Sequence, residues 1–281
     1  MNPNTTLISL LLLLLIGPSL KAQGYVDILP DEIKTPFIER YGLIAKELEK
    51  TVENEWAGTY SRYVAPTWSD YLFWSPKNGF AAFRDTCSDG PRAWVNYGTA
   101  SFRDGLLVVV PERGDTAEFV LKLPESEYTP IKWGKQHWLI PSDKLTLFAY
   151  AVNSGSPDEY GKFYSKINEP ENDGKVRPEL PLQYKRLLGL PPIKAKVTEI
   201  GPKAEVWNNE LTLDAGKNKG VIEGMSFWLI GVKNIDVKVV VEEVRDQTSR
   251  VRIASVGIWG DKQIEVVPKR GWRFASRYKG D

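Results

Sequence analysis

His137 is the only histidine among the 281 residues, so a Ser-His-Asp triad would have to use it as the general base. It stands between Gln136 and Trp138 in an apolar stretch typical of a strand, and no Gly-x-Ser-x-Gly motif occurs after residue 22. The paired carboxylates of a glycosidase cannot be recognised by spacing, because the fold sets their separation of about 5 to 10 Å. The alternative catalytic candidates are therefore three unranked aspartates and the histidine: Asp85, Asp89, Asp104 and His137.

The sequence holds few residues that could bind a metal ion or form a disulfide. One histidine excludes a His-cluster metal site, and one cysteine, Cys87, excludes a disulfide framework and a zinc ribbon within the chain. The stretch 214–225 resembles a calcium loop only in part, because Met225 stands where a bidentate carboxylate is required. The acidic residues at 169–173 lie in a polar loop and are interpreted as solvated charge. We predict no cofactor and no metal.

Aromatic side chains form the second class of candidates. Six of the ten tryptophans lie before residue 141, where they can fill a barrel core or stack on a ligand, and we expect most of them to fill the core. The segment 63–71 is the exception, because it reads as a loop in which three aromatic rings have little reason to be buried together. The predicted binding residues are Tyr63, Trp68 and Tyr71.

The balance of charge makes nucleic acid an unfavourable partner. The chain has 37 Lys and Arg against 36 Asp and Glu, so it lacks the positive excess that drives sequence-independent binding to nucleic acid. Residues 1–22 hold an apolar run, Leu7–Ile16, followed by a small residue, Ala22, as in a secretory signal peptide. We expect cleavage, with an uncleaved anchor as the alternative, and an extracytoplasmic protein, periplasmic or secreted, with no further membrane span.

The elements that would position these candidates begin with one helix. Apolar residues at helical spacing predict an amphipathic helix of about five turns between 35 and 52, with Thr35 as its cap and Pro36 at its first position. Short runs rich in aromatic and β-branched residues follow, separated by turns rich in Gly, Pro, Asn and Asp. This spacing favours an antiparallel meander or barrel against which the helix packs, with strands at 58–62, 71–75, 79–84, 93–97, 106–111, 118–123 and 136–140.

The region after residue 141 contains the domain boundary. Ser142 is expected to cap a helix that Gly155 ends, and the stretch 153–181 is expected to be irregular. A short helix around 182–188 precedes Pro191-Pro192, where we place the boundary. Alternating apolar residues then predict a small closed barrel with strands at 195–200, 204–207, 211–214, 225–230, 237–244, 249–256 and 263–266. The expected segments are a signal peptide at 1–22, a helix plus antiparallel β domain at 32–190 and a β-barrel domain at 193–281.

Two sets of motifs resemble known families. The first domain resembles a family of uncharacterised secreted bacterial proteins through WAGTY at 56–60, PKNGF at 76–80 and VNSG at 152–155, together with shorter matches between them. The second domain resembles small β-barrel modules of cell-envelope assembly proteins, such as the rod-shape-determining protein C and the carboxyl-terminal part of a flagellar assembly protein. The matching stretches are LTLDAG at 211–216 and GVIEGM at 220–225. The resemblance implies a barrel and an envelope setting, but no activity.

These observations together favour a mainly β (α+β) protein, with a helix packed on an antiparallel meander or barrel and a small barrel at the C-terminus. We expect a bacterial extracytoplasmic protein without catalytic activity, which binds a ligand or contacts the cell envelope, with an envelope protein or a glycan as partner. The alternative is a secreted hydrolase that uses carboxylates of the first domain. A pocket joining His137 to the three aspartates would favour that alternative.

Overall fold

The computed structural model confirms a mainly β protein built on two closed antiparallel barrels. It describes residues 29–50, 53–65, 68–86, 94–112, 121–123, 125–155, 157, 162–170, 176–201, 210–258 and 266–277. The chain divides into two compact units, one of residues 1–142 with 161–172 and one of 143–160 with 173–281. Within the described part of the chain, no helix is both long enough and apolar enough to span a membrane.

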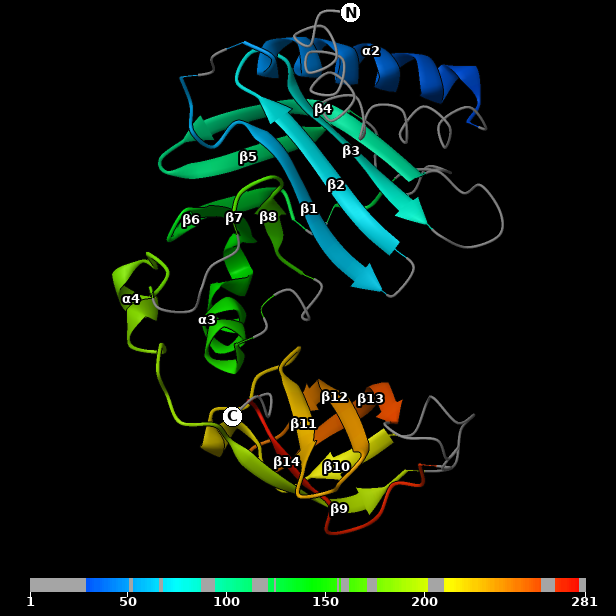
Figure 1. The fold of residues 1–281 in the computed structure, drawn as a ribbon, viewed down its shortest axis with the longest axis vertical. Helices are drawn as coiled ribbons and strands as arrows, with labels where there is room; N and C mark the ends of the chain where they lie inside the picture. The colour runs from blue at the N-terminus through cyan, green and yellow to red at the C-terminus, as the bar shows by residue number, and fades with distance from the viewer. Residues whose placement is uncertain are drawn as a thin grey trace, which may run out of the picture. The chain divides into compact units, whose positions relative to one another are not determined.

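The first unit contains an eight-stranded barrel in which each strand pairs with the next along the chain (Figure 1). Its last strand is only three residues long and pairs back with the first, with Lys166 opposite Tyr60, so that the barrel closes. The strands are β1 (Gly58–Ala65), β2 (Trp68–Ser75), β3 (Gly79–Thr86), β4 (Trp94–Arg103), β5 (Leu106–Pro111), β6 (Glu127–Trp133), β7 (Gln136–Pro141) and β8 (Tyr164–Lys166).

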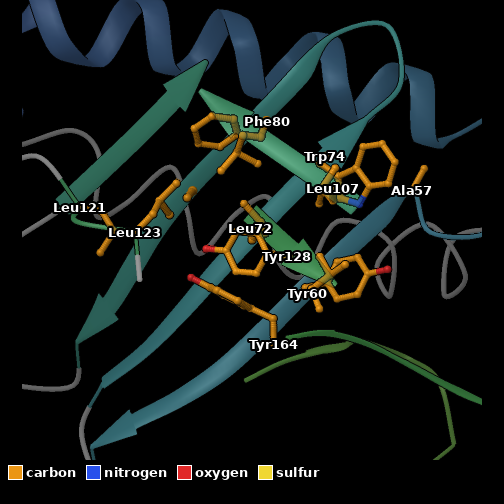
Figure 2. Packing of buried hydrophobic residues seen from close by; sticks show 13 residues of the cluster. Ala57, Tyr60, Leu72, Trp74, Phe80, Leu107, Leu121, Leu123, Tyr128 and Tyr164 are labelled. Atoms are coloured by element: carbon orange, nitrogen blue, oxygen red, sulfur yellow. The ribbon is translucent and has the colours of Figure 1, made fainter. Parts of the chain in front are cut away.

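Alternation along these strands separates the barrel interior from its outer face. On β2, Leu72 and Trp74 are completely buried in the inner cluster drawn in Figure 2, together with Tyr60 and Tyr128. The residue between them, Phe73, belongs to a second cluster on the outer face. Successive side chains of a strand point to opposite faces, so a strand that is apolar on both faces needs a cover on each side.

Helix α2 (Asp31–Leu48) supplies the cover for the outer cluster. It lies across β2, β3 and β4 and buries Ile33, Phe37 and Ile44 (Figure 1). The predicted start at Thr35 is wrong, because the helix begins four residues earlier and includes Pro36 in its interior. Acidic side chains at its first two positions favour this earlier start, since they complement the positive end of the helix dipole.

Several predictions for the first unit need correction. The segment 63–71 is not a loop, because β1 continues to Ala65 and β2 begins at Trp68. The stretch predicted as irregular, 153–181, holds the closing strand β8, and β6 was not predicted. The predicted strand at 118–123 falls largely outside the described residues, and its described part, 121–123, is not a strand.

The second unit contains a six-stranded barrel with the order β10-β13-β12-β11-β14-β9, closed by pairing of β9 with β10. Its interior is filled by alternating apolar residues such as Val237, Val239 and Val241. The predicted strand at 204–207 lies outside the described residues, and β14, which was not predicted, completes the barrel. The strands are β9 (Lys194–Ile200), β10 (Glu210–Leu213), β11 (Ser226–Ile230), β12 (Ile235–Val244), β13 (Ser249–Ile258) and β14 (Arg273–Ala275).

Two helices belong to the same unit as this second barrel. Helix α3 (Leu145–Ser154) ends at Gly155 as predicted, with φ of +81° at that glycine. Ser142 does not cap it, because a 3₁₀ turn (Ser142–Lys144) intervenes and the Ser142 hydroxyl pairs with that of Thr129. Helix α4 (Leu182–Lys185) confirms the predicted short helix. The folding boundary at Pro191-Pro192 stays a prediction.

Candidate binding site

One row of side chains crosses the inner face of four neighbouring strands in the first barrel. Arg62 on β1 is opposite Asp70 on β2, which in turn is opposite Arg84 on β3. Arg84 is opposite Trp94 on β4. Directly opposite residues of an antiparallel pair project to the same face, here the face that also carries Leu72. The strand register therefore brings two guanidinium groups and one carboxylate together inside the barrel.

Asp70 is the centre of this row, and its side chain is 0% exposed. Arg62 donates to Asp70 Oδ2 from Nε at 3.0 Å and from Nη2 at 2.5 Å. Arg84 donates from Nε to Oδ1 at 2.6 Å and from Nη2 to Oδ2 at 3.0 Å. The side chains of Arg62 and Arg84 are 10% and 19% exposed, so both guanidinium groups are largely removed from water. These three residues, called the Arg-Asp-Arg cluster below, carry a net charge of +1.

Two indole rings flank the cluster at the end of the barrel where β2 begins. The Arg84 guanidinium carbon lies 5.4 Å from the centroid of Trp68 and 5.9 Å from that of Trp94, within the range of cation–π attraction. Trp94 is partly buried, whereas 37% of Trp68 is exposed. Trp68 therefore connects the buried cluster to solvent.

Two buried tyrosines lie beside the cluster. Burial raises the pKa of both Tyr128 and Tyr164, so their hydroxyls stay protonated. Arg62 lies over the Tyr164 ring at 5.2 Å. Burial lowers the pKa of Arg62, but Tyr164 and Asp70 outweigh it and hold that pKa above its ordinary value. Figure 2 shows the hydroxyls of Tyr128 and Tyr164 pointing in the same direction, away from that of Tyr60.

The three predicted binding residues do not share one face. Tyr71 lies on the outer face, where it stacks on Phe83 at 4.9 Å and packs against the cluster covered by α2. Tyr63 is opposite Ser69, so it also belongs to the outer face, with 48% of its surface exposed. Trp68 is the one of the three that lies beside the Arg-Asp-Arg cluster.

The alternative catalytic residues lie on separate parts of the barrel. Asp85 is at the end of β3, beside the start of β4, whereas Asp104 follows the other end of β4. Ten residues of strand at about 3.3 Å each separate these two ends. His137 is on β7, and Asp89 lies outside the described residues. The structure therefore places Asp85, Asp104 and His137 apart from one another.

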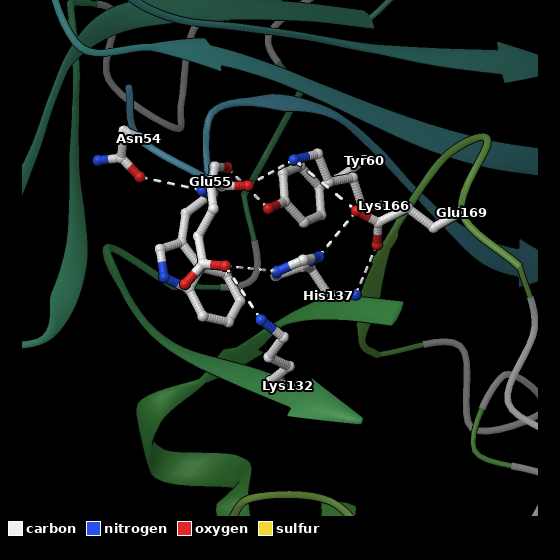
Figure 3. Close-up of polar contacts among 8 residues, drawn as sticks. Asn54, Glu55, Tyr60, Lys132, His137, Lys166 and Glu169 are labelled. Atoms are coloured by element: carbon white, nitrogen blue, oxygen red, sulfur yellow. Dashed lines mark hydrogen bonds and ion pairs between the residues drawn. The ribbon is translucent and has the colours of Figure 1, made fainter. Parts of the chain in front are cut away.

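His137 has other partners, which were not predicted. Glu169 accepts from the backbone N–H of His137 at 2.6 Å and pairs with its Nδ1 at 2.7 Å, and Glu55 lies 3.4 Å from its Nε2 (Figure 3). Trp56 packs edge-on against the imidazole at 4.7 Å. Glu169 is therefore a structural partner rather than the solvated loop charge expected from the sequence.

Two lysines complete the group around His137. Lys132 donates to Glu55 Oε2 at 3.1 Å, and this hydrogen bond, partly offset by burial, lowers the pKa of Glu55. Lys166 donates to the backbone oxygen of Glu55 at 2.5 Å, and burial lowers the pKa of Lys166. The polar atoms of this group bind one another and tie the segments before β1 and after β8 to the barrel (Figure 3). Among the described residues, no cluster of three His, Cys, Asp or Glu side chains could hold a metal ion.

Comparison with known proteins adds no relative: no family model, curated protein or solved structure matches this chain. The site therefore has to be interpreted from its own chemistry. Arginine stays protonated at all physiological pH values, so the Arg-Asp-Arg cluster can bind an anion but cannot exchange protons with a substrate.

Proposed function

We propose that this protein is an extracytoplasmic binding protein without catalytic activity, and that its first barrel receives a ligand at the end that carries Trp68. One observation supports this proposal most strongly. An indole ring that is 37% exposed lies directly beside Arg84, which shares one buried carboxylate with Arg62. Binding sites are typically apolar or aromatic surfaces with a few polar groups that fix orientation, and this barrel end has both parts. The leader segment at 1–22 supports the extracytoplasmic setting.

The alternative of a secreted hydrolase has less support. Its candidate residues lie apart, with Asp85 on β3, Asp104 in the turn after β4 and His137 on β7, and the His137 imidazole is engaged by Glu169. A nucleophile or an activated water would require one of these groups within hydrogen-bond reach of another. We therefore prefer binding to catalysis.

The second barrel supports an additional role at the cell envelope. Lys196 on β9 is opposite Arg273 on β14, and both are exposed. With exposed Lys194, two residues before Lys196 on β9, they form what we call the cationic face, and within the described part of the chain none of these three makes a salt bridge. Exposed cations attract an anionic surface, such as a bilayer with acidic headgroups. This role agrees with the resemblance of residues 193–281 to envelope assembly modules.

Trp68→Ala tests the first role, with the fluorophore N-phenyl-1-naphthylamine as a neutral aromatic probe. We expect a nearly unchanged melting temperature and a loss of probe binding, because Trp68 is exposed at one side. Trp74→Ala is the matched control, since Trp74 is completely buried and its truncation should cost about 3 to 5 kcal/mol. A large fall in melting temperature for Trp68→Ala would place that ring in the core and contradict a binding role.

Sedimentation with vesicles tests the second role. The protein should pellet with vesicles of phosphatidylglycerol and phosphatidylcholine but not with phosphatidylcholine alone, and Lys196→Glu with Arg273→Glu should abolish pelleting. Arg252→Glu is the matched control, because Arg252 is paired with Glu242 on the same barrel. Equal pelleting of all variants would contradict the envelope role.

A further inference from the structure

We propose that the ligand of the first barrel is a planar aromatic anion, whose ring stacks on Trp68 and whose carboxylate, sulfonate or phosphate group binds Arg84. This inference rests on the proposed function, because it names the chemical class of ligand for the same barrel end. It follows from the charge, the unused hydrogen-bond donors and the rigidity of the Arg-Asp-Arg cluster.

The charge of the cluster exceeds what a structural ion pair requires. One arginine would neutralise Asp70, yet two arginines converge on it, and both are at least four-fifths buried. An excess positive charge removed from water is unfavourable unless an anion or solvent compensates it. A negatively charged ligand would complete the neutralisation.

Asp70 leaves one nitrogen of each guanidinium, Nη1, without a hydrogen bond among the described residues. Asp70 already accepts four N–H groups, two from each guanidinium, so its oxygens have no room for further arginine donors. Arg62 lies over the completely buried ring of Tyr164. Arg84 is the more exposed of the two, at 19% against 10%, and it lies beside the exposed Trp68. An oxyanion can therefore bind Arg84 without displacing Asp70.

The guanidinium of Arg84 is held in place before any ligand arrives. Asp70 binds one edge of it, and the rings of Trp68 and Trp94 lie 5.4 and 5.9 Å from its central carbon. A side chain fixed in this way loses little conformational entropy when it binds an anion. Preorganised donors of this kind favour recognition of a small charged group by its geometry.

Trp68 supplies the surface for the ring that carries the anionic group. Its indole is tilted by 48° from that of Trp94, with 6.3 Å between the centroids, and more than a third of it is exposed. Aromatic rings stack on an exposed indole face with a gain in buried apolar area. A ligand with a ring and an acid group a few bonds apart would contact Trp68 and Arg84 together.

Two fluorophores with the same ring system test this proposal on the full chain. 8-Anilinonaphthalene-1-sulfonate differs from N-phenyl-1-naphthylamine by its sulfonate group, so the ratio of their affinities isolates the contribution of the anion. We expect the sulfonate probe to bind at least about tenfold more tightly than the neutral probe, because a charged hydrogen bond contributes that much affinity. Trp68→Ala should weaken both probes, and Arg84→Gln should reduce the ratio to near one.

Two further variants keep the test independent of folding. Arg84→Gln leaves one arginine for Asp70, and Arg84→Lys keeps the charge but removes the planar fork, so it should give an intermediate ratio. Arg252→Gln on the second barrel should leave both affinities unchanged. If both probes bind equally and depend on Trp68, the anion inference is wrong while the binding role stands. If neither probe depends on Trp68, the proposed function itself is contradicted.

Discussion

Both barrels carry arginines and acidic residues in a row across adjacent strands, but the two rows lie on opposite sides of the barrel wall. In the first barrel the row projects inward, and Asp70 is completely buried between Arg62 and Arg84. In the second barrel it projects outward and is called the outer ladder here. Its side chains are between 32% and 45% exposed, and its members are Glu210, Glu242, Glu243, Arg250 and Arg252.

The difference shows how one pairing chemistry serves two purposes. Cross-strand pairing places opposite charges side by side in both cases, and the pleat alone decides whether they face the core or water. Exposed ion pairs contribute little, because water and salt screen them. A buried carboxylate shared by two arginines cannot be removed without leaving cations in the core. The inner row should therefore dominate stability, and the outer ladder should not.

Asp70→Asn should produce the largest effect. It leaves two largely buried guanidinium groups without a counter-charge, which should lower the free energy of unfolding of the first barrel by roughly 3 to 5 kcal/mol. Denaturant titration followed by tryptophan fluorescence measures this loss. Glu210→Gln on the outer ladder is the matched control and should scarcely change the curve. A loss for Asp70→Asn no greater than that of the control would show that the inner row is effectively solvated.

Combining Asp70→Asn with Arg84→Gln should recover part of that loss. The double variant holds one uncompensated guanidinium instead of two, so the two changes should not be additive. We expect a coupling energy of about 1 kcal/mol or more between positions 70 and 84, in a double-mutant cycle. Strict additivity would contradict the shared carboxylate and indicate that each arginine interacts separately with solvent.

The fold could be predicted from sequence wherever alternation was strong. Alternation was clear at 237–244 and 249–256, where β12 and β13 confirm the predicted strands. The apolar runs at 106–111 and 136–140 are confirmed by β5 and β7. Strand β6 was missed because Pro130 and several polar residues interrupt it. Strands β8 and β14 are three residues long, too short for any periodic pattern, and they exist because neighbouring strands complete their pairing.

The site was harder to predict, although part of it was within reach. The strands predicted at 71–75 and 79–84 leave a turn at 76–78, and pairing Ser75 with Gly79 across it places Asp70 opposite Arg84. Interpretation of 63–71 as a loop concealed the second hairpin, which pairs Arg62 with Asp70. The partners of His137 were beyond prediction, because Glu55 and Glu169 come from segments outside any strand.

Glu169→Gln should give an intermediate effect, since the environment of Glu169 lies between those of the two rows. Its side chain is 19% exposed, and it accepts from the backbone N–H of His137 and pairs with the imidazole. Loss of the carboxylate charge should lower the free energy of unfolding by about 1 to 3 kcal/mol, as expected for hydrogen bonds to a charged group. The change can be measured by thermal unfolding, with Glu127→Gln on the exposed side of β6 as control. No difference from that control would mean that the group around His137 contributes nothing to barrel closure.

Arg250→Gln should have the smallest effect, and its dependence on pH and salt should identify the outer ladder. Hydrogen bonds and charge from Arg245 and then Arg250 hold the pKa of Glu243 below its ordinary value. A carboxylate with a lowered folded pKa stabilises the protein above its unfolded pKa, and this contribution is lost as the pH falls through the folded pKa. The difference between wild type and Arg250→Gln should therefore be present at pH 7, decline below about pH 4.3 and vanish at about 1 M salt, where the screening length is about 3 Å. Unfolding curves at pH 7 and below about pH 4.3, each at low salt and at about 1 M salt, measure this difference. A difference that persists at high salt would show that Arg250 stabilises the barrel by packing rather than by charge. The two rows would then differ only in how far their arginine side chains are buried.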